Sequence, residues 1–228
     1  MAAKETALTI KRNFKRTGQK LVKKFVDLPT GNVCDAQGRI GALDYRIKPV
    51  SKMSRLCGIA LTVDAGPRDN LGPWAALEIA RPGDVIVITT GDHLSCSVVG
   101  DIYTGMAKNA GVVGIVTDGV VRDLPGIDSV GIPVFARGVS PNSPWKNGPS
   151  RVGLPITIGG VAVKAGDIVV GDQDGIVIVA REKAGDVSRT LQVVLAKEKQ
   201  MEASVKSGLT VPAWLKEAYN TKGVQYQD

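Results

Sequence analysis

A strand–helix–strand pattern is the feature that most constrains the fold of this 228-residue chain. The branched run Val-Ile-Val-Ile-Thr at 85–89 predicts a buried strand. Residues 97–110 predict a helix that ends at Gly111, and residues 111–117 predict a second buried strand. Two successive strands joined through a helix lie parallel in one sheet. The pattern therefore predicts the α/β class with a partly parallel sheet.

Further predicted elements extend this unit in both directions, and we expect one domain over residues 1–228. A loop rich in Pro, Gly, Ser and Asn occupies 141–155, and a layer of short strands follows it. Within that layer, Gln-Asp-Gly at 173–175 predicts a hairpin turn. The other expected elements are a short helix at 31–40, strands at 56–64 and 132–136, a helix at 73–80 and a long C-terminal helix at 181–208.

The net charge of +7 comes from one end of the chain. Residues 1–25 hold eight of the 29 basic residues and one of the 22 acidic residues, so the remainder is neutral. Apolar residues at 21, 22, 25 and 26 predict that this arm is helical with one apolar side. Its basic side is either a solvated face, a contact for an acidic partner or RNA, or an organellar transit segment. A neutral body makes nucleic acid an unexpected partner for the rest of the chain.

Several classes of protein are not expected from this composition. No apolar run approaches the roughly 18–20 residues that span a bilayer, and no secretory signal is recognisable. The single histidine, His93, excludes most zinc sites built on histidine. Cys34, Cys57 and Cys96 form no CxxC pair, which indicates a reduced, cytoplasmic protein. We expect His93 to be structural, although its spacing from Cys96 could mimic a catalytic Cys–His pair.

Two polar motifs suggest a binding site. Gly100-Asp101 lies near the first turn of a predicted helix, where free N–H groups favour a carboxylate or phosphate. Twenty residues lie between Asp101 and Arg122, a spacing that returns the chain to the sheet edge where ligands bind. Arg122 can hold carboxylate or carbonyl oxygens, and Asp123 can hold Mg²⁺ or Mn²⁺. The alternative is a turn with a surface ion pair of no functional consequence.

Four segments together resemble a known family, the class II pyruvate aldolases that cleave 4-hydroxy-4-methyl-2-oxoglutarate and 4-carboxy-4-hydroxy-2-oxoadipate. The resemblance runs from about residue 17 to about residue 210. The same superfamily contains the regulator of ribonuclease activity A, which lacks the acid that follows the arginine of Arg122-Asp123. The segments are Gly-Asp-Ile-Tyr at 100–103, Thr-Asp-Gly-Val-Val-Arg-Asp at 117–123, the run 132–141 and the run 160–179.

The resemblance implies an α-β-β-α sandwich similar to the swivelling phosphohistidine domain, assembled as a homotrimer or homohexamer with the site between subunits. It assigns Arg122 to the substrate oxygens and Asp123 to direct binding of the metal ion. Asp101 matches an acid near the metal, and Glu198 matches a glutamate on the C-terminal helix of a neighbouring subunit, with Glu202 as the alternative. Backbone N–H groups hold the 2-oxo acid carboxylate, and they come from Gly100, Asp101, Ile102 and Tyr103.

Two positions depart from the pattern of that family. An acid is usual three residues after the metal aspartate, where this chain has Gly126, and an aliphatic residue is common where it has Tyr103. The function implied is metal-dependent retro-aldol cleavage of a 4-hydroxy-2-oxo diacid to pyruvate and a second oxo acid, with oxaloacetate decarboxylation as a side activity. The alternatives are a non-enzymatic binding protein like the ribonuclease regulator, or another 2-oxo-acid lyase on the same scaffold.

Overall fold

The computed structural model describes residues 6–227. The chain divides into two compact units, residues 1–191 and residues 192–228. Helix α6 (Ala184–Lys206) begins in the first unit, and helix α7 (Trp214–Lys222) lies in the second. All strands belong to the first unit, as do the candidate site residues from Gly100 to Asp123.

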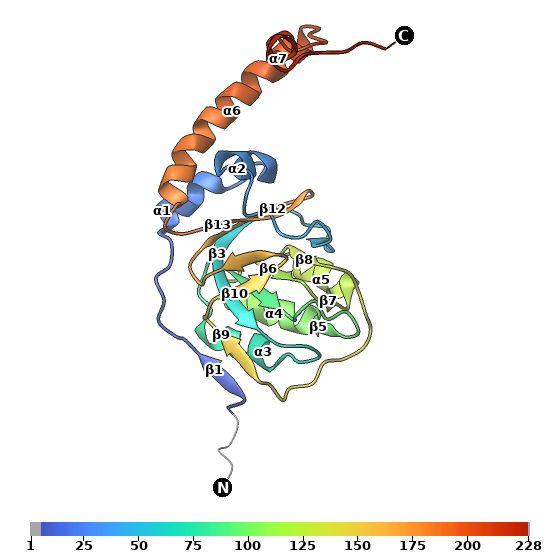
Figure 1. The fold of residues 1–228 in the computed structure, drawn as a ribbon. Coiled ribbons are helices and arrows are strands. Elements are labelled where there is room, and N and C mark those ends of the chain that lie inside the picture. The colour runs from blue at the N-terminus through green and yellow to red at the C-terminus, as the bar shows by residue number, and fades with distance from the viewer. Residues whose placement is uncertain (1–5, 228) are drawn as a thin grey trace. The chain divides into compact units, whose positions relative to one another are not determined.

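Four parallel strands form the centre of the first unit, in the order β3–β4–β6–β8 (Figure 1). Helix α4 (Asp101–Asn109) lies between β4 and β6 in the chain. The predicted strand–helix–strand unit and the α/β class with a mostly parallel sheet are therefore confirmed. The four strands are β3 (Leu56–Asp64), β4 (Asp84–Thr89), β6 (Gly114–Thr117) and β8 (Val134–Ala136).

Short strands extend this sheet and add a second layer. The long strand β3 pairs with β12 along 56–59 and with β9 along 63–64, both antiparallel. The hairpin predicted around 173–175 is present, because β12 and β13 pair from Ile168–Val179 to Asp172–Gly175. A separate two-stranded sheet consists of β10 (Ile156–Ile158) and β11 (Val161–Val163). The short strands of the main sheet are β1 (Leu8–Ile10), β2 (Lys48–Pro49), β9 (Ser150–Val152), β12 (Ile168–Asp172) and β13 (Gly175–Val179).

Each face of the central sheet carries its own hydrophobic core. In β4, Ile86 and Ile88 enter one core and Val85 and Val87 enter the other, as the two-residue period of a strand requires. The first core includes side chains of α3 (Leu71–Ile79), α4 and α5 (Leu124–Val130). The second includes side chains of β10, β11 and the segment 43–47. The helices therefore cover one face and a strand layer covers the other.

Two predicted elements differ from those observed. The helix expected over 97–110 begins only at Asp101, because Ser97–Val99 forms strand β5, which pairs in parallel with β7 (Val120–Val121). The loop expected over 141–155 contains strand β9. Both segments are short, and each forms a strand because it pairs with a strand that is distant in the sequence. The short helix near the N-terminus, α2, spans Thr30–Ala36.

The N-terminal arm is not the continuous helix that the sequence predicted. It forms strand β1, which pairs in parallel with β9, and turns helical only at α1 (Gln19–Val22) and the 3₁₀ turn Lys23–Phe25. The side chain of Arg16, which is 14% exposed, donates to both carboxylate oxygens of the buried Asp84, at 3.1 and 2.9 Å. Part of the arm's charge is therefore neutralised by the body. Residues 1–5 of the arm lie outside the described residues.

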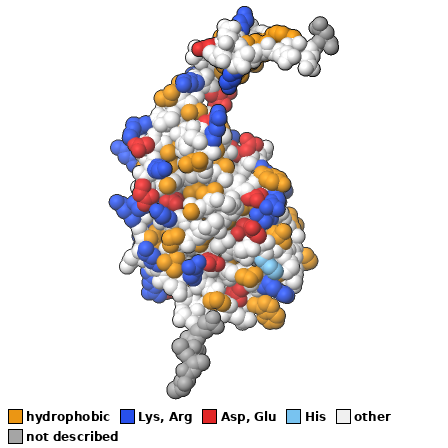
Figure 2. Space-filling model, viewed as in Figure 1, with side chains coloured by type: hydrophobic (Ala, Val, Ile, Leu, Met, Phe, Trp, Pro, Cys, Tyr) orange, Lys and Arg blue, Asp and Glu red, His pale blue; other side chains and the backbone are white. Residues whose placement is uncertain are grey.

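Charged side chains of both signs lie on the face of the first unit that Figure 2 shows. On the face seen in Figure 2, Lys and Arg side chains alternate with Asp and Glu side chains. This arrangement does not form the continuous basic stripe that is typical of nucleic-acid binding. Within the described part of the chain, no helix is both long enough and apolar enough to cross a bilayer.

The buried pair Arg16–Asp84 generates a stability prediction. The Asp84 side chain is 1% exposed, so replacing Arg16 by Ala leaves a buried carboxylate with only backbone donors such as the N–H of Arg81. We expect the free energy of unfolding to fall by about 3 kcal/mol, measured by urea denaturation. Arg12→Ala is the matched control, because the Arg12–Glu78 pair is 65% and 58% exposed and should contribute less than about 1 kcal/mol. Equal losses in the two variants would contradict this account of the arm.

Candidate active site

One cavity of about 270 Å³ collects the residues that the two polar motifs singled out. The first turn of α4 supplies residues 100–103, and the turn between β7 and α5 supplies Arg122 and Asp123. These segments meet because β5 and β7 are parallel, so the chain leaves both strands at the same end. The other lining residues are Asn70, Trp74, Ser97, Val98, Val99, Ser143, Pro144 and Lys146.

The first turn of α4 offers backbone donors to this cavity. Gly100 is extended, with φ −138° and ψ −164°, and its carbonyl oxygen accepts hydrogen bonds from the N–H and the hydroxyl of Thr104. The N–H groups that follow Gly100 have no acceptor within the helix and lie at the positive end of its dipole. One of them is already engaged, because the N–H of Ile102 donates to Oδ1 of Asp101 at 2.7 Å. The Asp101 carboxylate therefore occupies one of the free N–H groups in the first turn of its own helix.

Arg122 and Asp123 form the charged wall of the cavity. Nε of Arg122 lies 3.2 Å from Oδ2 of Asp123, and Nη1 of Arg122 donates to the hydroxyl of Ser143 at 2.6 Å. Asp123 has φ 61° and ψ 44°, a left-handed conformation that is uncommon for a residue with a side chain. The two side chains are 40% and 44% exposed, so both can reach a ligand.

Two glycines allow the acidic side chains to take these positions. A Cβ on Gly100 would lie 2.5 Å from Oδ2 of Asp123, and a Cβ on Gly126 would lie 2.3 Å from Oδ2 of Asp101. Neither distance is possible between non-bonded atoms. Gly126, where an acid is usual in the resembling family, therefore leaves space that the Asp101 carboxylate occupies.

The side chain of Tyr103 is buried in the hydrophobic core next to the cavity. It is 2% exposed, and its hydroxyl donates to the carbonyl oxygen of Pro73 at 2.9 Å. Its ring meets Trp74 edge-on, with the ring centroids 5.3 Å apart. Burial raises the pKa of the Tyr103 phenol well above its usual range, which keeps it protonated. Only the backbone N–H of Tyr103 is suited to bind a substrate.

The oxygen atoms present suit a hard divalent cation whose other ligands are water and substrate oxygens. Asp123 contributes carboxylate oxygens that are open to the cavity. Among the described residues, no group of three or more His, Cys, Asp and Glu side chains could enclose a metal ion. Mg²⁺ is usually bound by one or two carboxylates, with water and substrate oxygens completing its shell. Asp123 is therefore the residue of this cavity whose carboxylate could hold such an ion.

The predicted glutamates belong to another part of the chain. Glu198 and Glu202 lie in α6 beyond residue 191, in the second unit. The cavity described here is built from the first unit alone. Their role in a neighbouring subunit's site stays a prediction.

Several lining residues were not found by sequence reasoning, among them Asn70, Trp74, Ser143 and Lys146. Asn70 and Trp74 come from the start of α3, and Ser143 and Lys146 come from the loop expected at 141–155. No local motif marks them, because α3 and this loop reach the cavity only through the tertiary fold. The loop is fixed there by backbone hydrogen bonds between residues 68–70 and Trp145.

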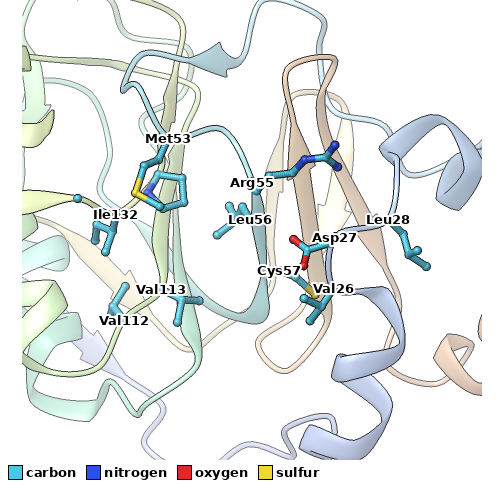
Figure 3. A pocket seen from close by; sticks show the side chains of 13 residues that line it. Val26, Asp27, Leu28, Met53, Arg55, Leu56, Cys57, Val112, Val113 and Ile132 are labelled. Atoms are coloured by element: carbon cyan, nitrogen blue, oxygen red, sulfur yellow. The ribbon is translucent and has the colours of Figure 1, made fainter.

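The thiols and the histidine do not form a second catalytic centre. All three cysteines are free, and burial is the main cause that raises the pKa of each thiol. Cys57, with a pKa of about 12, lines an apolar cavity of about 290 Å³ beside Val26 and Asp27 (Figure 3). A thiol with a raised pKa is a poor nucleophile at neutral pH. Nε2 of His93 lies 2.6 Å from the hydroxyl of Ser95, a local contact.

Comparisons with known proteins agree with this fold. A protein of Halalkalibacterium halodurans, provisionally named a 4-hydroxy-4-methyl-2-oxoglutarate aldolase, is 34% identical over 80% of this chain and 85% of its own length. The crystal structure of an uncharacterized protein from Pseudomonas syringae is 29% identical with a TM-score of 0.76, covering 86% of this chain and 97% of the other.

A Streptomyces coelicolor protein, described as an unusual member of the RNase ES inhibitor RraA family, is 27% identical with a TM-score of 0.73. The alignment covers 84% of this chain and 100% of the other. The model of the RraA-like family, described as Aldolase/RraA, matches residues 30–178. The chain therefore belongs to the RraA-like family of aldolases and RraA proteins.

Proposed function

We propose that this protein is a divalent-metal-dependent aldolase that cleaves a 4-hydroxy-2-oxo diacid into pyruvate and a second oxo acid. The observation that carries the proposal is the cavity that Arg122 and Asp123 line together with the first turn of α4. A backbone anion site, a guanidinium and a carboxylate within one small cavity suit a 2-oxo acid and a cation. The aldolase name of the relative from Halalkalibacterium halodurans supports the same reaction class.

The 2-oxo acid end of the substrate binds at the start of α4. Its carboxylate accepts hydrogen bonds from the N–H groups at the start of α4, and Arg122 donates to the keto oxygen. The incoming carboxylate competes with Asp101 for the N–H of Ile102, which is now 2.7 Å from Oδ1 of Asp101. Substrate binding therefore frees the Asp101 carboxylate to face the reacting atoms.

Cleavage of the C3–C4 bond leaves the enolate of pyruvate, and the site must stabilise that negative charge as it develops. Arg122 supplies a fixed positive group at the enolate oxygen. Asp123 would hold Mg²⁺ or Mn²⁺, which when bound supplies Lewis-acid polarisation of the keto acid. Asp101 and a glutamate from a neighbouring subunit would take the proton from the C4 hydroxyl. That glutamate is Glu198 or, as the alternative, Glu202.

The same chemistry has two further consequences. Decarboxylation of oxaloacetate passes through the same enolate, so that side activity is proposed as well. A glutamate supplied in trans requires an oligomer with the site between subunits, and the resemblance implies that this oligomer is a homotrimer or homohexamer. A regulatory binding role like that of RraA is the alternative, and Asp123, the acid that distinguishes the aldolases in the resemblance, favours the enzyme.

The metal dependence and Asp123 can be tested together. We expect EDTA to abolish pyruvate release from a 4-hydroxy-2-oxo diacid and Mg²⁺ to restore it. Asp123→Asn should lower kcat/KM by roughly 100-fold or more, the scale of losing a group that stabilises developing charge. The exposed Asp35→Asn is the control and should leave activity unchanged. Cleavage that persists in EDTA, or in folded Asp123→Asn, would reject this mechanism.

Gly100→Ala tests whether the approach of Asp123 to α4 matters for activity. The new Cβ meets the end of a rotatable side chain, Oδ2 of Asp123, at 2.5 Å, and lies 3.2 Å from Cγ of Arg122, while the φ of Gly100 suits any residue. The protein should therefore fold, with Tm close to the wild type, while kcat/KM falls by roughly 100-fold because the carboxylate is displaced. Gly105→Ala, whose Cβ would lie 3.8 Å from Val130, should be active. Normal activity in Gly100→Ala would show that this position of Asp123 is dispensable.

A further inference from the structure

A serine in the loop between β8 and β9 holds the side chain of Arg122. Nη1 of Arg122 donates to the hydroxyl oxygen of Ser143 at 2.6 Å, across 21 residues of sequence. Nε of the same guanidinium lies 3.2 Å from Oδ2 of Asp123. Among the described residues, these two side chains are the polar partners of the Arg122 guanidinium. One partner is therefore a neutral hydroxyl, and the other is a carboxylate.

The backbone that carries Ser143 is fastened to the strand that leads into the site. The carbonyl oxygen of Asn142 accepts from the N–H of Ser97 at 3.0 Å and from its hydroxyl at 2.8 Å. Ser97 is 1% exposed and begins β5, which ends directly before Gly100. Nδ2 of Asn142 donates to the carbonyl oxygen of Ser95 at 3.1 Å, and its Oδ1 accepts from the N–H of Ser143 at 3.0 Å. These bonds fix Ser143 relative to the first turn of α4.

The two partners of Arg122 respond differently to a bound cation. A divalent cation on the Asp123 carboxylate attracts the oxygen that Arg122 now contacts, and it repels the guanidinium. The hydroxyl of Ser143 has no net charge, so it can accept from Arg122 without competing for the cation. It also leaves the full positive charge of the guanidinium available to a substrate oxygen. Ser143 is therefore the partner that can stay in place when Asp123 binds a cation.

We propose that Ser143 is a positioning residue, which keeps the Arg122 guanidinium in the cavity when Asp123 binds a cation. The inference rests on the proposed function, in which Arg122 stabilises the enolate oxygen and Asp123 holds the metal ion. The Arg122 side chain is 40% exposed and has several rotatable bonds, so without a partner it would spend part of its time turned into solvent. Ser143 restricts this motion and acts on the reaction only through Arg122.

Ser143→Ala tests this role by kinetics. Ser143 is exposed, so loss of its hydroxyl should leave Tm close to that of the wild type. We expect kcat for cleavage of a 4-hydroxy-2-oxo diacid to fall roughly 10-fold, because Arg122 is no longer held where negative charge develops. KM should change by less than about threefold, since the N–H groups of α4 still bind the substrate carboxylate.

Two further variants are the controls for this measurement. Ser143→Thr retains a hydroxyl at the same position and should recover most of kcat. Ser129→Ala removes an exposed hydroxyl that donates to the carbonyl oxygen of Pro125 in its own helix, and it should keep the kcat of the wild type. Wild-type kcat in Ser143→Ala, or no recovery in Ser143→Thr, overturns the inference.

A double variant separates the positioning of Arg122 from a general effect on the loop. Arg122→Ala alone should lower kcat/KM roughly 100-fold or more. If Ser143 acts through Arg122, adding Ser143→Ala should leave kcat/KM within about threefold of that value. Losses that multiply in the double variant mean that Ser143 acts independently of Arg122, and they overturn the inference.

Binding of pyruvate gives a readout that requires no turnover. Titration calorimetry of the full-length protein compares the wild type with Ser143→Ala, first in EDTA and then in Mg²⁺. In EDTA, Asp123 still holds Arg122, so the variant should lose less than about threefold in affinity. In Mg²⁺, Ser143 is the partner that remains, and its loss should weaken binding roughly 10-fold. Equal losses in the two conditions, or no loss in Mg²⁺, overturn the inference.

The two kinds of measurement separate failure of this inference from failure of the proposed function. Cleavage by the wild type with an equal kcat in Ser143→Ala overturns the inference and leaves the aldolase proposal standing. A wild type that binds pyruvate in Mg²⁺ but cleaves no 4-hydroxy-2-oxo diacid rejects the aldolase proposal, and the pyruvate affinities then decide the role of Ser143. A wild type that binds no pyruvate, with or without Mg²⁺, overturns both.

Discussion

The close approach of two turns at the end of the β5–β7 pair is the contact on which the site depends. The N–H of Arg122 donates to the carbonyl oxygen of Val99 at 3.2 Å, so the turn that carries Asp123 is fastened to the residue before Gly100. Gly100 has no side chain, and this allows Oδ2 of Asp123 to lie where a Cβ would otherwise be. The anion-binding end of a helix and a carboxylate can therefore share one small cavity. A carboxylate this near a helix N-terminus is also favoured by the helix dipole.

The packing beneath the cavity supports both of its walls. Tyr103, from the first turn of α4, donates its hydroxyl to Pro73 of α3 and packs its ring against Trp74. The same helix, α3, begins beside Asn70. A buried tyrosine thus joins the first turn of α4 to α3, and both helices contribute lining residues to the cavity. The tyrosine at a position where an aliphatic residue is common in the resembling family therefore has a structural reason.

Much of the fold follows from local sequence, and the exceptions share one physical cause. The strands at 56–64 and 85–89 and the hairpin at 168–179 are branched runs bounded by turns, which specify their own state. Segments 8–10 and 97–99 become strands because a distant partner supplies their hydrogen bonds. The candidate site divides in the same way. Asp101 and Asp123 lie in motifs that can be found by spacing, whereas Asn70 and Lys146 enter the cavity through contacts that no local pattern encodes.

The first unit contains two arginine–aspartate pairs that differ in burial. One is largely buried and stabilises the fold, and the other is partly exposed and lies in the candidate site. In the pair Arg16–Asp84 the side chains are 14% and 1% exposed, and separating them would leave a carboxylate in a medium that cannot solvate it. In the pair Arg122–Asp123 the side chains are 40% and 44% exposed, so water can replace either partner at a cost of about 1 kcal/mol or less. A site that must release its arginine to a substrate and its aspartate to a cation requires a pair of the second kind. The weakness of the Arg122–Asp123 contact is therefore consistent with the ligand-binding role proposed for the pair.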